Sequence, residues 1–250
     1  MRFEMTEQDI HMLIQEAQQY GVQLSNEKAK KLLKHLELVI EKNQFINLTR
    51  IVDWQDGIDK HVLDSLTPLT ILQDLGLTEK SHCLDIGTGA GFPGIPLSIC
   101  SEAQFTLIDS TEKKIKEVQY FIDRLELDNC SAQAVRAEEL AKKQSQKFDF
   151  ILARAVSQMS TLIEYASPLL SQSSYLVVMK AVPTDEEFNI SLYAADVCGM
   201  TYVSRETLEL PHNAGTRSIF VYQKTGKAKI KMPRNVGVAQ HHPLCPKEKK

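Results

Sequence analysis

The apolar positions of the first 75 or so residues recur with the spacing of helices rather than strands. A first apolar stripe lies within residues 10–17 and stops at Gly21, a residue type that commonly ends a helix. Ser25 is a suitable N-cap for a second helix, whose apolar stripe lies within residues 29–40. A polar and aromatic connection, NQFINLTRIVDWQD, leads to a third helix expected over 58–72. The N-terminal region is therefore predicted to be helical throughout.

From residue 81 the pattern changes to short apolar runs separated by helical segments. The runs are HCLDIG, QFTLIDS, CSAQAVRAEE, FDFILARA, SYLVVMK, TYVSRETLEL and RSIFVYQK. Such alternation is typical of an α/β fold with parallel strands and crossover helices. The last two runs leave no room for a helix between them, so these two strands are expected to pair antiparallel. We expect a helical region over 1–80, a sheet domain over 81–224 and a basic C-terminal extension over 225–250.

Composition places the chain among ordinary globular proteins. It has 250 residues, of which 43% are hydrophobic and 24% charged, as expected for a chain with its own hydrophobic core. No run of about 18 apolar residues is present to span a bilayer. The N-terminus, MRFEMTEQDIHML, carries acids where a signal peptide would be apolar. We therefore expect a cytoplasmic monomer with no membrane partner.

Neither the cysteines nor the histidines form a metal-binding pattern. The five cysteines are scattered and include no C-x-x-C pair. His241, His242 and Cys245 lie close together but lack a fourth ligand, so no metal is expected. The net charge of −3 conceals a basic end, because the chain from Lys224 onward has eight Lys or Arg residues and one acid. An anionic partner would meet a local basic patch rather than a basic protein.

Four of the chain's 11 glycines lie in the segment CLDIGTGAGFPGIPLSIC. This segment follows a predicted strand and precedes a predicted helix, at the sheet edge where open α/β sheets bind ligands. Glycine permits a positive φ and a close approach of the backbone to a ligand. The segment is therefore predicted to be a cofactor-binding loop, with Gly87 and Gly89 at the ligand. For Gly91 and Gly94, tight packing of helix on strand is at least as good an explanation.

The loop is compatible with two classes of cofactor. Residues 89–94 match the G-x-G-x-x-G dinucleotide pattern and Asp109 ends the next strand, as in NAD-dependent oxidoreductases. Against this, Asp85 stands inside the strand end, and Pro93 and Pro96 remove N–H donors that a pyrophosphate would need. An acid-x-Gly-x-Gly-x-Gly loop followed by a strand-ending acid resembles instead the class I S-adenosylmethionine-dependent methyltransferases. Asp109 would then bind the ribose, although it could also cap the helix that follows.

Longer segments are similar to one methyltransferase family. In order along the chain they are INLTRI, KHVLDSL, LDIGTGAGFPGIPLSI, FTLIDS, RAEEL, FDFILARAV and VVMKA. Together they resemble the bacterial 16S rRNA guanine-N7 methyltransferases called RsmG or GidB (glucose-inhibited division protein B), which are named for guanine-527. The resemblance covers residues 43–224. It implies a Rossmann-like class I fold, S-adenosylmethionine as cofactor, and 16S rRNA or the small ribosomal subunit as partner.

The resemblance also implies roles for individual residues. The residues that it places at the cofactor are Gly87, Phe92, Asp109, Ala137, Glu138 and Arg154. The loop pattern adds Asp85 and Gly89 to this set. In the N-terminal polar motif it places Asn47, His61 and Asp64, the first two as RNA contacts. Arg154 and Lys180 are the implied catalytic residues, and Lys180 is also expected at the RNA. This sequence departs from the family at Ala181, where the family commonly has glycine. The conformation of the turn after Lys180 can therefore differ from that in the family.

Methyl transfer to N7 of guanine suits a site without a catalytic dyad. In neutral guanine N7 carries a free lone pair, so no base is needed, and catalysis rests on proximity and alignment. Donors such as Arg or Lys would orient the base. The fourth strand ends in LARAVS, without the N-P-P-Y-like segment expected of an adenine-N6 enzyme.

Each of these roles has a structural alternative. Arg154 could form an ion pair with Glu138 or Asp85, Lys180 could be merely solvated, and His61 could pack the helical region. A basic strip for RNA phosphates, or simply for solubility, would comprise Arg217, Lys224, Lys227, Lys229, Lys231 and Arg234. For the whole protein, the alternatives are a methyltransferase acting on another RNA or a small molecule, an NAD-dependent oxidoreductase, and a non-catalytic ribosome-binding factor.

Overall fold

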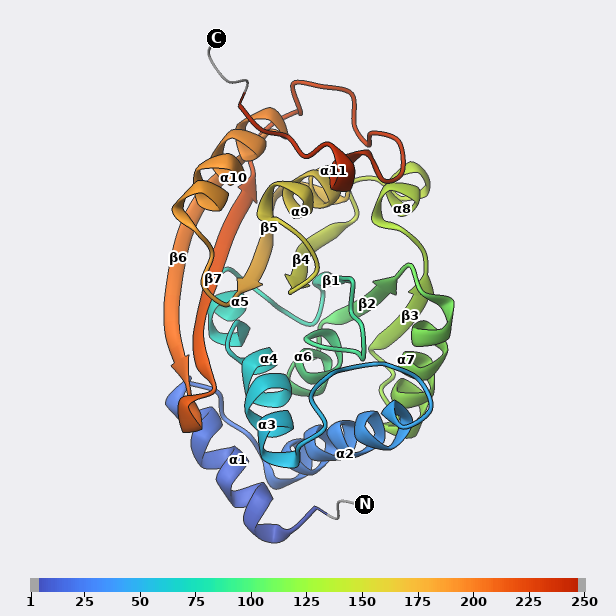
Figure 1. Cartoon of the computed structure of the whole chain (residues 1–250), viewed down its shortest axis with the longest axis vertical. Coiled ribbons are helices and arrows are strands. Elements are labelled where there is room, and N and C mark those ends of the chain that lie inside the picture. The colour runs from blue at the N-terminus through green and yellow to red at the C-terminus, as the bar shows by residue number, and fades with distance from the viewer. Residues whose placement is uncertain (1–4, 247–250) are drawn as a thin grey trace.

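A mixed seven-stranded sheet with helices on both faces dominates the computed structural model, which describes residues 5–246 (Figure 1). The strand order is β3-β2-β1-β4-β5-β7-β6. β1 to β5 are parallel, whereas β7 pairs antiparallel with both β5 and β6, which confirms the predicted antiparallel end. The strands are β1 (His82–Ile86), β2 (Gln104–Asp109), β3 (Cys130–Ala134), β4 (Phe148–Arg154), β5 (Leu170–Lys180), β6 (Met200–Leu210) and β7 (Gly215–Lys224).

The helices precede, connect and follow these strands. Before the sheet come α1 (Glu7–Gln19), α2 (Asn26–Asn43), α3 (Trp54–Gly57), the π-helical turn η1 (Ile58–Leu63), α4 (Asp64–Leu66) and α5 (Leu69–Asp74). Within and after it come α6 (Gly94–Cys100), α7 (Glu112–Arg124), α8 (Ala137–Lys143), α9 (Met159–Ala166), α10 (Asp185–Val197), the 3₁₀ turn η2 (Pro211–Asn213) and α11 (Val238–His241). Among residues 5–246, no helix has the length and apolar character needed to cross a membrane.

Both faces of the sheet are buried, which explains why its strands read as continuous apolar runs. In β4, Phe150 and Leu152 pack into a core shared with the N-terminal helices. The alternate residues, Ile151 and Ala153, pack on the other face against residues of α8, α9 and α10. The face of the sheet that the N-terminal helices cover is the one that also carries α6 and α7 (Figure 1). The helical region therefore shares its core with the sheet domain.

The N-terminal helices begin where the sequence predicts but the third one is interrupted. Ser25 caps α2, with its side chain accepting a hydrogen bond from the backbone of Lys28. The single helix expected over 58–72 is wrong in detail, because the chain forms η1, the short α4 and then α5. Pro68, which has no backbone N–H to continue a helix, separates the last two. The wider π-helical turn carries His61 toward the sheet.

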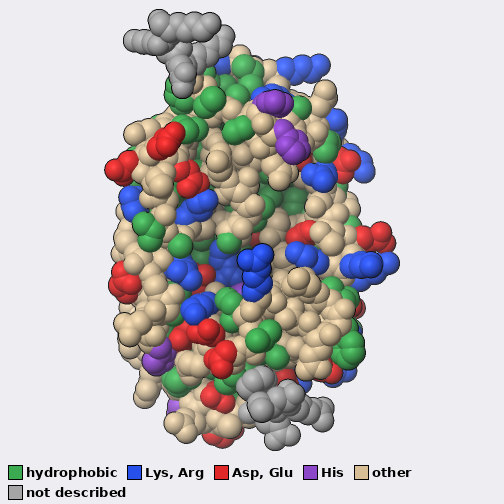
Figure 2. Space-filling view, in the orientation of Figure 1, with side chains coloured by type: hydrophobic (Ala, Val, Ile, Leu, Met, Phe, Trp, Pro, Cys, Tyr) green, Lys and Arg blue, Asp and Glu red, His purple; other side chains and the backbone are tan. Residues whose placement is uncertain are grey.

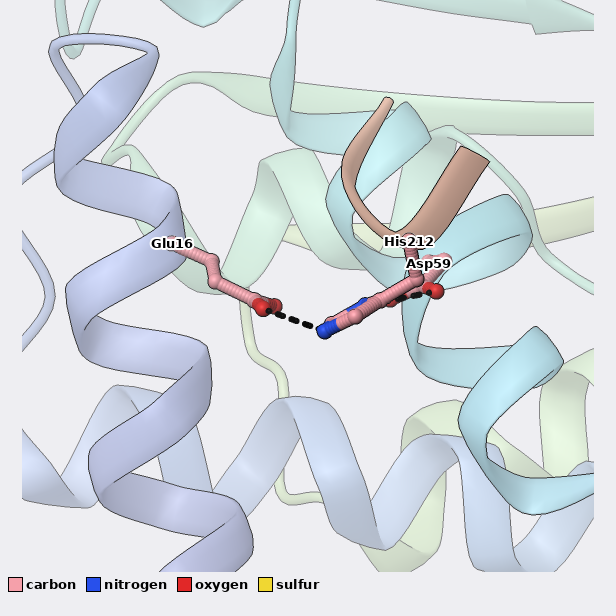
Figure 3. A group of neighbouring side chains, drawn as sticks. All are labelled: Glu16, Asp59 and His212. Atoms are coloured by element: carbon pink, nitrogen blue, oxygen red, sulfur yellow. Dashed lines mark hydrogen bonds and ion pairs between the residues drawn. The ribbon is translucent and has the colours of Figure 1, made fainter. Parts of the chain in front are cut away.

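An imidazole links α1 to the turn between β6 and β7 (Figure 3). The Nδ1 of His212 lies 3.1 Å from an Asp59 carboxylate oxygen, and its Nε2 lies 3.5 Å from a Glu16 oxygen. Burial raises the pKa of Glu16, while the neighbouring His212 acts in the opposite direction. The three side chains could form a metal-ligand set, since their ligand atoms lie within 4.8 Å of one another. Each ring nitrogen already faces a carboxylate, however, so a contact that joins η2 to α1 and η1 accounts for the group.

Lys224, the last residue of β7, and the C-terminal extension that follows it do not offer all their charges to solvent. Lys224 is buried, and its ammonium donates to the Ser167 hydroxyl at 2.7 Å and the Cys198 carbonyl at 2.8 Å. Arg234 forms an ion pair with Glu164, whose side chain is 3% exposed. Lys224 and Arg234 therefore do not belong to an exposed basic strip. The last part of the extension, 247–250, lies outside the described residues.

The buried contacts of Lys224 make it a structural residue. Burial lowers the pKa of its ammonium, and removal of the side chain would leave the Ser167 oxygen without its buried donor and the Cys198 carbonyl with the Ser167 hydroxyl as its remaining side-chain donor. We predict that Lys224→Ala lowers the free energy of unfolding by about 1–3 kcal/mol, as measured by urea denaturation. Lys227→Ala, at an exposed position three residues further along the chain, is the control and should change the unfolding midpoint little. Equal stability of the two variants would contradict this role.

Candidate functional site

A cavity of about 480 Å³ opens at the carboxyl ends of β1, β2, β3 and β4. Ligand pockets for drug-sized molecules fall within roughly 300–1,000 Å³, so this cavity is large enough for a cofactor. The residues expected at a cofactor that do line it are Gly87, Gly89, Phe92, Asp109, Ala137, Glu138 and Arg154. Asp85 does not line the cavity, because its carboxylate lies beneath the glycine loop.

The glycines of the loop after β1 differ in the space around them. At Gly89, which has a φ of +59°, a Cβ would have no atom nearer than 4.0 Å, so this glycine faces open space at the cavity. Gly87 has a φ of +71°, and a Cβ there would lie 2.6 Å from Val156 Cγ2. At Gly91 a Cβ would lie 2.5 Å from Ile95 Cδ1, and at Gly94 it would lie 2.7 Å from Leu107 Cγ. The structure thus favours the packing explanation for Gly91 and Gly94.

The N-terminus of α6 has no N–H group left for a pyrophosphate. Pro93 and Pro96 have none, the Gly94 N–H donates to Asp85 at 3.0 Å, and the Ile95 N–H donates to the Gly91 carbonyl at 2.8 Å. Dinucleotide-binding folds place the pyrophosphate on such donors. Burial raises the pKa of Asp85 to about 6, and the Gly94 N–H partly offsets this effect. The loop therefore lacks the feature on which an NAD site would rely.

Asp109 ends β2 with its carboxylate at the cavity. One oxygen accepts from the Thr111 N–H at 2.8 Å and the other from the Gly89 N–H at 3.3 Å. Thr111, not Asp109, is the N-cap residue of α7, so the capping explanation for Asp109 is wrong. Each carboxylate oxygen keeps a lone pair for a further donor. A ribose diol is such a donor, and the apolar Ile108 and Val135 that also line the cavity suit an adenine ring. The residues present therefore fit S-adenosylmethionine.

A second cavity, also of about 480 Å³, adjoins the first. Its lining includes Lys180 and Arg217 together with Asp64. His61, Arg154 and Ala155 line both cavities. Ala155 has a φ of +54°, an unusual value for a residue with a Cβ, and such strain tends to occur at functional sites. The chain thus turns sharply where the two cavities meet.

Arg154 is held by the N-terminal region. Its Nη1 lies 3.0 Å from an Asp64 oxygen and 3.1 Å from the Lys60 carbonyl. Asp64 is also bound by Arg217, whose Nε lies 3.0 Å from the other carboxylate oxygen. The structural alternative, an ion pair of Arg154 with Glu138 or Asp85, is wrong in its partner, since α4 places Asp64 next to the guanidinium. Only 5% of the Asp64 side chain and 12% of the Arg154 side chain are exposed, so this cluster is firmly placed.

His61 forms part of the wall between the cavities. Its ring stacks on Phe92 with the centroids 4.6 Å apart, and its Nε2 lies 2.8 Å from the Thr49 hydroxyl. Burial, with Arg154 as the second cause, lowers the pKa of His61 to about 3. The ring is therefore neutral near pH 7. Because Arg154 can only donate to Nδ1, at 3.4 Å, the network implies a proton on Nε2.

His35 is a supporting residue that the sequence analysis did not identify. Its Nε2 lies 3.0 Å from the Ala90 carbonyl of the glycine loop, and its ring lies 4.4 Å from that of Phe92. Burial lowers the pKa of His35 to about 3. The available signal was its place three residues after Leu32 within the apolar stripe of α2, an unusual position for a polar residue.

The remaining expected residues lie at different distances from the site. The Lys180 ammonium contacts a Glu187 carboxylate at 2.8 Å and the Ser157 carbonyl at 2.9 Å, so it is not merely solvated. Asn47 is exposed and lines neither cavity. Gln240, from the C-terminal extension, lines the first cavity although sequence reasoning gave no reason to expect it there.

The strand order and the cavity position define the class I methyltransferase fold. A candidate sarcosine dimethylglycine methyltransferase from Galdieria sulphuraria superposes with a TM-score of 0.56 at 11% identity, covering 70% of this chain and 89% of that chain. The cyclase SpnF is also similar, with a TM-score of 0.54 at 15% identity over 65% of this chain and 82% of its own. Because a cyclase shares it, the fold alone does not establish methyl transfer.

The family follows from sequence comparison. Residues 28–213 match the family model GidB, described as rRNA small subunit methyltransferase G. The chain is 34% identical to the ribosomal RNA small subunit methyltransferase G of Lactobacillus johnsonii, over 92% of this chain and 97% of that protein. It is 36% identical to the protein of the same name from Oenococcus oeni, over 88% and 91% of the two chains. The chain belongs to the GidB family, and S-adenosylmethionine is its cofactor.

The two buried histidines predict that stability decreases in acid. Each has a folded-state pKa near 3 against about 6.5 when unfolded, so the unfolded chain binds more protons between these values. Above pH 6.5 these two histidines should not affect the free energy of unfolding. Below pH 6.5 that free energy should fall by up to about 1.4 kcal/mol per pH unit for each histidine. His35→Gln, which keeps a donor for the Ala90 carbonyl, should flatten the slope measured by urea unfolding between pH 6 and 4.5. An unchanged slope would contradict this account.

Proposed function

We propose that this protein transfers the methyl group of S-adenosylmethionine to N7 of a guanine in 16S rRNA. The observation that carries the proposal is the junction of two cavities at His61, Arg154 and Ala155. The first cavity suits the cofactor and the second has room for a base. Membership of the rRNA small subunit methyltransferase G family supports an rRNA substrate.

The cofactor would be held by main-chain and side-chain groups of the first cavity. Asp109 would accept hydrogen bonds from the ribose, and Ala137 with Glu138 would flank the adenine. Gly87 and Gly89 would bring the backbone next to the methionine portion. When bound, S-adenosylmethionine supplies an electrophilic methyl group on a sulfonium.

The second cavity would present the guanine without removing a proton from it. N7 of neutral guanine has a lone pair and no hydrogen, so its attack on the methyl carbon breaks the carbon–sulfur bond with no general base. The two carboxylates that line this cavity, Asp64 and Glu187, are both ion-paired with basic side chains. They are therefore poorly placed to act as bases, which agrees with this reaction.

Arg154 would orient the guanine. Its Nη1 is committed to Asp64 and the Lys60 carbonyl, whereas Nη2 makes one long contact of 3.4 Å with His61. Nη2 is thus the donor available for O6 of the base, a frequent arginine contact to guanine. The stacked His61 and Phe92 rings would fix the wall behind it. Alignment of this kind supplies much of the rate enhancement in displacement reactions.

The surroundings of the cavities suit RNA. Lys60, Lys180 and Arg217 line the second cavity, and Figure 2 shows Lys and Arg side chains gathered over the middle of this face. We assign Lys180 and Arg217 to the RNA near the base, Lys180 also as a catalytic residue, and the exposed Asn47 to the RNA outside the cavities. The target guanine has to leave any base stack to reach the cofactor. We propose the small ribosomal subunit as the partner and a monomer as the active form.

The reaction is tested with small ribosomal subunits that lack their native 7-methylguanosine. Labelled S-adenosylmethionine should transfer its methyl group to a single guanine, identified as 7-methylguanosine after nuclease digestion. Binding of S-adenosylhomocysteine without any transfer would contradict the substrate. Thermal stabilisation by NAD rather than S-adenosylhomocysteine would contradict the cofactor.

Arg154→Lys tests the orienting residue. The substitution keeps the positive charge but loses the planar fork that reaches both Asp64 and the base. We predict that kcat for methyl transfer falls about 100-fold or more, the cost typical of small misplacements of reacting groups. The protein should stay folded, because Asp64 retains its pair with Arg217. Arg205→Lys, on β6 and outside both cavities, is the control, and similar activity of the two variants would remove Arg154 from the site.

A further inference from the structure

The C-terminal extension returns to the cofactor cavity after leaving the sheet. In Figure 1 it runs across the top of the molecule and places α11 beside α9. The Thr161 hydroxyl of α9 donates to the Ala239 carbonyl at 3.1 Å, and Ala239 is 1% exposed. The family match ends at residue 213, so it assigns no role to this segment.

An ion pair fastens the extension to α9. Arg234 donates from Nε to one Glu164 oxygen at 2.6 Å and from Nη2 to the other. The same Nη2 also donates to the His242 carbonyl at 2.9 Å, which closes residues 234–242 into a loop around α11. Such bidentate arginine–carboxylate contacts are geometrically specific. The loop is therefore held in one position.

The loop also contacts a residue expected at the adenine. The Gly237 N–H donates to a Glu138 carboxylate oxygen at 2.9 Å, and Glu138 is 5% exposed. Glu138 lines the cofactor cavity together with Ala137, Tyr165 and Gln240. The extension thus contributes both a hydrogen bond to the cavity wall and a side chain to its lining.

We infer that residues 234–242 form the outer wall of the adenine end of the cofactor site, and that the Gln240 amide recognises the adenine edge. An amide carries a donor and an acceptor in one plane, and adenine offers the complementary pair in its amino group and an adjacent ring nitrogen. Among the described residues, the Gln240 amide has no hydrogen-bond partner, so it is available. The inference rests on the proposed cofactor site.

Binding of S-adenosylhomocysteine to the full chain, measured by calorimetry, tests the amide. Gln240→Ala should raise Kd about two- to tenfold, the range for one lost hydrogen bond. His241→Ala is the matched control, since His241 is exposed on the same short helix and does not line the cavity. An unchanged Kd for Gln240→Ala, or an equal rise for both variants, would overturn the role of Gln240.

A ligand analogue separates recognition of adenine from a general effect on the loop. S-Adenosylhomocysteine without its adenine amino group should bind the wild-type protein more weakly than the natural compound. Gln240→Ala should bind the two compounds with nearly equal Kd, because the interaction that distinguishes them is gone. Undiminished discrimination by the variant would overturn the inference.

Proteolysis tests the wall itself. Lys227 and Lys231 are exposed in the segment that leads to the loop, so trypsin can cut there. S-Adenosylhomocysteine should slow this cleavage, whereas NAD should not, because a ligand stabilises the conformation that binds it. Cleavage at the same rate with bound ligand would contradict a wall in the extension. If the wild-type protein bound no S-adenosylhomocysteine at all, the proposed function would itself fail, which distinguishes the two results.

Discussion

The buried carboxylate of Asp64 is the contact on which the geometry of the site depends. It binds Arg154 from β4 and Arg217 from β7, each at 3.0 Å, and it comes from the helical region that precedes the sheet. One residue thus joins three segments that are far apart in sequence. Removing Asp64 would be costly, since both guanidinium groups would stay largely buried without their carboxylate partner. This requirement fixes where the N-terminal region sits over the carboxyl ends of the strands.

A rigid junction is what methyl transfer to a guanine nitrogen would require of a protein. With no proton to remove, the chain contributes mainly by holding the base and the methyl donor in line. The wall between the cavities has little conformational freedom, because neutral His61 stacks on Phe92 and the Asp64 cluster holds Arg154. His35 also stabilises the glycine loop, because its ring is within hydrogen-bond distance of the Ala90 carbonyl. The N-terminal helices are thereby part of the site as well as of the core.

Local sequence patterns were sufficient to predict much of the fold. The apolar runs separated by helical segments predicted the parallel strands, and the short link after the sixth strand predicted the antiparallel end. The helix expected over 58–72 was wrong in detail, because its first part is a π-helical turn, whose Lys60 carbonyl accepts from Arg154 of β4, a contact that local propensity does not encode. The glycine loop and Asp109 could be located because backbone geometry and strand ends leave a signal in a short segment.

The sequence by itself determined most of the elements and the family resemblance, and through that resemblance the class of cofactor, since these depend on neighbouring residues and on motif spacing. Only the tertiary structure decided the partner of Arg154, which is Asp64 and neither Glu138 nor Asp85. Likewise, it decided that Lys224 is buried and that Gln240 lines the cavity at the carboxyl ends of β1 to β4. The reason is physical: pairing and burial depend on which distant segments meet in space, and local periodicity carries no information about such contacts.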